Sequence, residues 1–89
     1  MNVIKSVTTE SLSTGISRIY AVVLVGGSAN SSVVLNDSVS GTGTDKIALK
    51  VLANDSKTFV VDGKDAVTFD TGVYSTLSGS GASVYVYYK

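Results

Sequence analysis

Apolar and polar residues alternate along most of this chain, with the period of two that is typical of a β-strand. Ile47, Leu49 and Val51 share one side of such a segment, and Val84 and Val86 do so near the C-terminus. The alternation and the glycine- and serine-rich stretches between the segments divide the chain into short strands. The expected strands cover residues 3–7, 16–25, 32–36, 46–53, 58–61, 66–69, 73–77 and 82–88.

Two of the connections predict β-hairpins. Asp62-Gly63 lies between the segments 58–61 and 66–69, and Asp-Gly between apolar runs favours a tight turn because both central residues must take positive φ. The second expected hairpin joins residues 73–77 to 82–88 across Ser78-Gly79-Ser80-Gly81. Residues 8–15 are polar and are expected to lie outside the strands.

The second half of the longest strand, AVVLV at residues 21–25, is apolar at every position. A strand of this kind is covered on both faces. Either the loop at residues 8–15 covers the second face, or a neighbouring subunit does.

About eight short strands in 89 residues leave no room for a layer of helices. Valine, serine and threonine dominate the composition, and they suit strands and turns. We therefore expect an all-β fold, a small antiparallel β-sandwich or jelly roll, as a single domain over residues 1–89. Residues 1–15 are expected to form either an extended N-terminal arm or an edge strand.

The chain contains no cysteine and no histidine. It therefore lacks disulfides, thiolate metal sites, the commonest general base and the commonest metal ligand. So small a domain has a marginal core and usually needs additional support. Subunit contacts are the support that remains, so we expect a homotrimer or a homodimer.

Charge and the length of the apolar runs argue against two classes of partner, nucleic acids and membranes. Seven basic and seven acidic residues cancel, and the lysines are scattered, whereas nucleic-acid binding needs a concentrated positive surface. The longest apolar run, residues 21–25, is far shorter than a membrane span. The N-terminal residues do not have the pattern of a signal peptide. We expect a soluble protein that is made in a cytoplasm and binds neither nucleic acid nor membrane.

Asp70-Thr71-Gly72 matches the active-site triplet of aspartic proteases. In the retroviral enzymes, however, the triplet lies early in the chain and Ala or Ser follows it, whereas here Val73 follows and only 17 residues remain. A tight corner explains the triplet better, with Gly72 at an unusual φ and Asp70 bonding nearby backbone. The other turn aspartates lack the spacing of a calcium loop. We expect no catalytic residue, no metal and no cofactor.

Three tyrosines are candidate interface residues. Tyr85 and Tyr87 point away from the side formed by Val84 and Val86, and Tyr74 lies in the preceding strand. Exposed tyrosines are common at protein interfaces and also occur in sugar sites. Three interpretations remain open at this point: an interface, ordinary cross-strand packing, or stacking on a sugar.

The order of these strands and turns resembles a recurring type of small tailed-phage protein. The resemblance covers residues 13–89 and is carried by STGISRIY, by the strand that ends at Val25-Gly26-Gly27, and by VTFDTGVYSTLSGSGASVYVYY. In that type, Thr71-Gly72 corresponds to a corner.

The resemblance implies a non-enzymatic β-sandwich component of a virion. Its expected role is a capsid decoration (cement) protein or a head–tail accessory protein, whose partners are other copies of itself and the major capsid, neck or tail proteins. The alternative is a small carbohydrate- or receptor-binding module of a phage tail or neck, in which Tyr74, Tyr85 or Tyr87 would stack on sugar rings.

Overall fold

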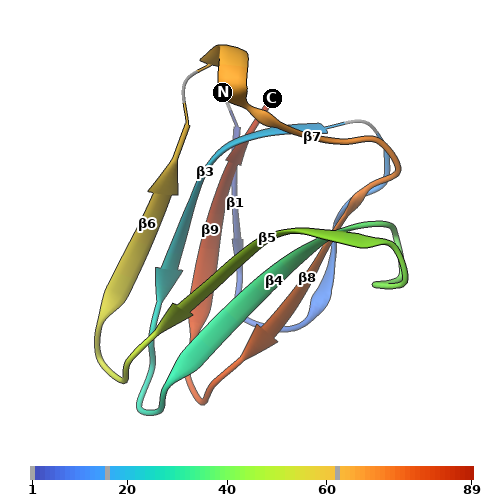
Figure 1. The fold of residues 1–89 in the computed structure, drawn as a ribbon. Coiled ribbons are helices and arrows are strands. Elements are labelled where there is room, and N and C mark those ends of the chain that lie inside the picture. The colour runs from blue at the N-terminus through green and yellow to red at the C-terminus, as the bar shows by residue number, and fades with distance from the viewer. Residues whose placement is uncertain (1, 16, 62) are drawn as a thin grey trace.

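The computed structural model describes residues 2–15, 17–61 and 63–89 and is a sandwich of two antiparallel sheets (Figure 1). Sheet A has the strand order β1-β9-β3-β6, and β7 also pairs with β3. Sheet B has the order β2-β8-β4-β5. The expected all-β sandwich is therefore confirmed. The strands are β1 (Asn2–Ser6), β2 (Glu10–Ser13), β3 (Ser17–Val25), β4 (Ser31–Asp37), β5 (Thr44–Val51), β6 (Ser56–Val60), β7 (Val67–Phe69), β8 (Val73–Ser78) and β9 (Ser83–Tyr88).

The strand pairings are nested in the manner of a jelly roll. β1 pairs with β9, β2 with β8, β3 with β6 and β7, and β4 with β5. β3 also pairs with β9, and β4 with β8, which closes the two sheets. The chain thus behaves as one long folded ribbon that is rolled up, and most of its connections pass from one sheet to the other.

The core lies between the sheets and is built from the alternation that the sequence predicts. β3 contributes Ile19, Val22 and Leu24, and β9 contributes Val84 and Val86, all of which are buried. β7 adds Phe69 from the same sheet. Sheet B supplies the facing side chains: Val33, Leu35, Ile47, Leu49 and Val73.

Both predicted hairpins are wrong. β6 and β7 do not pair with each other: both run antiparallel to β3, with Val60 opposite Ala21 and Val67 opposite Ile19. They are two parts of one edge strand, which stops at Val60 and resumes at Val67, and a short 3₁₀ turn at Gly63–Asp65 lies between them. Asp62, the first residue of the expected turn, lies outside the described residues. The local Asp-Gly signal is overridden because β3 offers a long apolar edge to both segments.

The second expected hairpin fails for a different reason. β8 belongs to sheet B and β9 to sheet A, so the connection at residues 79–82 crosses the sandwich. Val73 on β8 and Val84 on β9 are both buried, and they approach the core from opposite sheets. Gly79 and Gly81 take positive φ values of 117° and 76°, which turn the chain between the layers.

The polar residues 8–15 also differ from expectation, because they contain β2. This strand pairs with β8 at the edge of sheet B, and β1 forms an edge of sheet A. Residues 10–13 therefore lie in the opposite sheet from AVVLV and do not cover its outer side. Of the two possible covers for that side, the chain's own loop is excluded.

Three loops meet at one end of the sandwich, where β3, β5 and β8 end (Figure 1). Ser28 N–H donates to the carbonyl of Ser80 at 3.0 Å, and Asn54 N–H donates to the carbonyl of Gly27 at 2.8 Å. A Cβ on Gly27 would overlap the carbonyl oxygen of Ser80. Glycine is therefore required here by the close approach of two backbones.

We expect Gly27→Ala to lower the free energy of unfolding by roughly 2 kcal/mol or more, because backbone has to move to admit the methyl group. Urea unfolding followed by circular dichroism measures this. The neighbouring Ser28→Ala serves as the control and should change the stability by less than about 0.5 kcal/mol. Equal stability of the two variants would contradict the close approach.

One buried hydroxyl is a second point for a stability test. The Ser75 Oγ lies in the core without a hydrogen-bond partner among the described residues. Because an unpaired buried polar group is costly, we expect Ser75→Ala to raise the free energy of unfolding by roughly 1 kcal/mol. Ser31→Ala is the matched control and should be destabilising, since the buried Ser31 hydroxyl donates to the carbonyl of Ala29 at 2.9 Å.

Candidate interaction surface

The outer side of sheet A, which we call the sheet A face, is mostly apolar. The pairing register places Val3, Tyr87, Ala21 and Val60 in one row across β1, β9, β3 and β6. Val60 and Val3, at the two ends of this row, are 68% and 54% exposed. Valines so exposed at both ends of one row mark a surface that the single chain leaves uncovered.

A second row lies beside the first and consists of Lys5, Tyr85, Val23 and Thr58. The Lys5 Nζ is 5.6 Å from the centre of the Tyr85 ring, which is cation–π distance. Further along, Val25 lies between Ser83 and Ser56. Lys5 is the only charged residue in these rows, which are therefore almost uncharged. Arg18, exposed on β3 opposite Thr68 of β7, lies beyond them, with its guanidinium 6.0 Å from the centre of the Tyr20 ring.

The sheet A face is also hollowed along β3. Ala21 and Val23 form the floor of a depression of about 420 Å³, and the bulkier Tyr87 and Val60 flank it. Tyr20, Val61 and Thr58 complete its lining. A register irregularity in the β3–β9 pairing falls between Ile19 and Ala21. The profile of the face is therefore a groove over β3 between two ridges, on β9 and β6.

The structure brings together two of the three predicted interface tyrosines. Tyr85 and Tyr87 lie on the sheet A face, in the two rows described above. Tyr74 belongs to β8 in sheet B, where it pairs with Ser11 and Asn36 and its ring lies against Gly41. The three residues therefore do not form one site.

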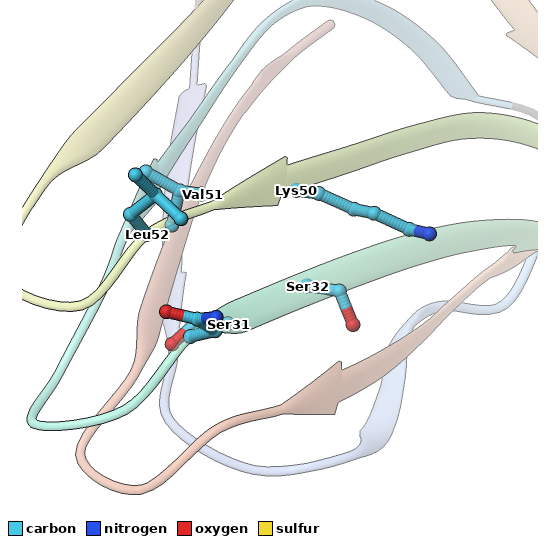
Figure 2. Close-up of a pocket in the computed structure, with 6 residues that line it drawn as sticks. Ser31, Ser32, Lys50, Val51 and Leu52 are labelled. Carbon is cyan, nitrogen blue, oxygen red and sulfur yellow. The ribbon is translucent and has the colours of Figure 1, made fainter.

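A second depression, of about 380 Å³, lies on sheet B beside the end of β5 (Figure 2). Its lining is Asn30, Ser31, Ser32, Lys50, Val51 and Leu52. The Asn30 side-chain oxygen already accepts a hydrogen bond from the Ala53 N–H at 3.1 Å. In Figure 2 the Lys50 side chain extends away from Ser31. Lys50 is the one titratable group in this lining, so the depression lacks the pair of convergent groups that general acid–base chemistry requires.

The Asp70-Thr71-Gly72 triplet forms the expected corner between β7 and β8, but a residue that the sequence did not indicate holds it. Asp37, at the end of β4, accepts hydrogen bonds from the backbone N–H groups of Thr71 at 2.8 Å, Asp70 at 3.1 Å and Gly72 at 3.4 Å. Asp70 itself is exposed. The expectation that the Asp70 side chain bonds the corner is therefore corrected: the carboxylate that holds it is that of Asp37.

Gly72 also differs from expectation, because its φ is not positive. A Cβ at this position would lie 2.7 Å from the carbonyl oxygen of Ser13 and 3.0 Å from that of Ser38. Glycine is needed here because three segments pack closely, and not because of an unusual backbone conformation.

Hydrogen bonding lowers the pKa of Asp37. The N–H of Thr71 has the largest effect, the N–H groups of Asp70 and Gly72 and the charge of Lys46 act in the same direction, and partial burial opposes them. The Lys46 Nζ is 3.6 Å from Asp37 Oδ2 and donates to the carbonyl of Thr68 at 2.8 Å. Asp37 and Lys46 thus join β4 and β5 to the segment that leaves β7.

Asn36, the neighbour of Asp37, secures the β4–β5 loop. Its side-chain N–H₂ donates to the Gly43 carbonyl at 2.9 Å and to Asp45 at 2.7 Å. Its side-chain oxygen accepts from the Gly43 N–H and from the Ser38 hydroxyl. Asn36 and Asp37 are structural groups, and their position between a strand and a glycine-rich loop is the signal in the sequence that could have identified them.

Within the described residues, the structure has no group of three or more side chains of the metal-binding types. No helix in that part of the chain is long and apolar enough to cross a membrane.

The structure defines a jelly-roll sandwich whose most distinctive surface is the apolar face of sheet A. Comparison of the chain with family models, curated proteins and solved structures found no match.

We expect Asp37→Asn to destabilise the fold at neutral pH, because an amide places a donor against backbone N–H groups. Folding lowers the pKa of Asp37 below its ordinary value of 3.8. The stabilisation is therefore complete above the pKa of the unfolded chain and is lost as the pH falls through the lower folded value. Unfolding measured from about pH 5 to pH 2 should show a smaller loss of stability in Asp37→Asn than in the wild type.

Asp70→Asn is the matched control for this experiment, and it also tests the protease alternative. It should leave stability and assembly unchanged, since only the backbone of Asp70 takes part in the corner. Peptide cleavage with an acid optimum, inhibited by a pepstatin-like compound and lost in Asp70→Asn, would show that the chain is an aspartic protease after all.

Proposed function

We propose that this chain is a non-enzymatic structural protein of a tailed-phage particle, and specifically a capsid decoration (cement) protein that stabilises the shell as a homo-oligomer. The observation that carries the proposal is the apolar sheet A face, on which Val3 and Val60 are exposed at the two ends of one row across four strands. A contiguous exposed apolar surface of this kind is typical of a site for protein association.

Two further points support a virion role. Jelly rolls recur in viral capsid proteins, although a fold alone does not define a function. The order of strands and turns also resembles small tailed-phage proteins, as described above. The partners that follow are further copies of the chain and the major capsid protein, or neck and tail proteins, after synthesis in the host cytoplasm.

The alternative is a carbohydrate- or receptor-binding module of a tail or neck, because jelly rolls also occur in lectins. Tyr20 and Tyr87 at the hollow of the sheet A face favour it, since tyrosine rings can stack on sugars. Sugar sites also need several convergent polar groups, however. Apart from the tyrosine hydroxyls, the lining of this hollow supplies only Thr58. The decoration role is therefore the better supported of the two.

Quantitative mass spectrometry of purified particles tests the proposal. We expect the chain to be a virion component in hundreds of copies, the number that a decorated shell requires. About a dozen copies or fewer would place it in the neck or tail, because these structures have low-order rotational symmetry. Absence from particles, or glycan binding that is lost in Tyr87→Ala, would contradict the decoration role.

A further inference from the structure

We propose that the sheet A face packs against the same face of a second copy, around a two-fold axis that runs along the strands between β3 and β9. The inference rests on the proposed function only in treating this face as an association surface. It adds the identity of the occupant and the geometry of the contact, both of which follow from the strand register.

The first row of the sheet A face is complementary to itself when its order is reversed. A half-turn about the proposed axis exchanges β9 with β3 and β1 with β6. Tyr87 then lies opposite Ala21 of the second copy, and Val3 lies opposite Val60 of the second copy. The bulkiest side chain of the row meets the smallest, and the two exposed valines of the row cover each other, as an isologous interface requires.

The second row behaves in the same way. Tyr85 lies opposite Val23 of the second copy, and Lys5 lies opposite the hydroxyl of Thr58. The one charge in these two rows thus meets a polar group and not another charge. The two Lys5 residues of the pair are on opposite edges, about 14 Å apart across three strand spacings, where salt screens their repulsion.

The hollow of the sheet A face accommodates the tyrosines. Sheets that stack face to face lie about 10 Å apart with their strands nearly aligned. At that separation a Tyr87 ring reaches the groove over Ala21 and Val23 of the other copy, whose volume is about 420 Å³. The ridge on β9 therefore enters the groove on β3, and it does so twice in the pair.

The size of the face indicates how tightly the pair is held. Four strands and five residues along each strand span about 19 Å by 17 Å. This is smaller than the roughly 800 Å² that each partner buries in a standard interface. We therefore expect a reversible dimer with a dissociation constant in the micromolar range, which is well populated where the chain is concentrated.

Cross-linking between two introduced cysteines tests the geometry, since the chain has no cysteine of its own. The double variant Val3→Cys/Val60→Cys places thiols that face each other across the proposed interface, at positions exposed enough to tolerate the change. A short bis-maleimide should convert it into a covalent dimer on a denaturing gel. Each single variant should remain monomeric, because identical positions lie on opposite edges.

A charge on the sheet A face tests whether the contact depends on that face. Val23→Lys, added to the double cysteine variant, should reduce cross-linking and raise the dissociation constant by at least about tenfold. Thr76→Lys, at an exposed position of β8 in the other sheet, is the matched control and should change neither. Circular dichroism confirms that both lysine variants are folded.

Three outcomes would overturn the inference: cross-linking of the single variants as efficient as that of the pair, cross-linking unaffected by Val23→Lys, or a double variant that stays monomeric at roughly 100 µM. If the chain is abundant in particles but fails this test, the decoration role stands and the sheet A face is instead the surface that contacts a capsid protein. A chain that passes the test but is absent from particles would leave the dimer intact and refute the virion role.

Discussion

The rest of the structure depends on the contact between the inner side of β3 and the inner side of sheet B. β3 is the strand to which β9, β6 and β7 all pair, and its Ile19, Val22 and Leu24 are almost fully buried. In a chain without disulfides this burial is the main source of stability. Once β3 is fixed against sheet B, the register of three other strands follows from it.

The ends of the sandwich are secured by groups that face away from the sheet A face. Asp37 and Asn36 hold the corner and the long loop at one end, and the close approach of Gly27 and Ser80 secures the other. Because stability comes from the core and from these ends, the outer side of sheet A is free to be apolar. The surface most suited to association is thus separated from the parts that maintain the fold.

The sequence was a good guide to what depends on single strands and a poor one to what joins them. Alternation identified Val84 and Val86 as core residues and Tyr85 and Tyr87 as their outward neighbours. It failed at both hairpins, because whether two neighbouring strands pair is decided by the edges that the rest of the chain offers. Asp62-Gly63 carries a strong local signal, yet the segments on its two sides pair with β3.

For the candidate site, too, features of single strands could be predicted and contacts between distant strands could not. That AVVLV carries apolar side chains on both sides of its strand could be predicted, but the position of Tyr74 on the other sheet could not. The role of Asp37 was also out of reach, because its partners lie more than 30 positions away in the sequence. Interactions of that kind become visible only when the nesting of the strands is known.

The interruption of the edge strand between β6 and β7 has a consequence for how copies of this protein behave at high concentration. A continuous strand along β3 would present a long row of free backbone groups to solvent, and rows of this kind recruit further strands into open-ended fibres. Here the row is divided into β6, with five residues, and β7, with three. Growth through main-chain hydrogen bonding is thereby discouraged, so that concentrated copies of the chain do not polymerise strand to strand.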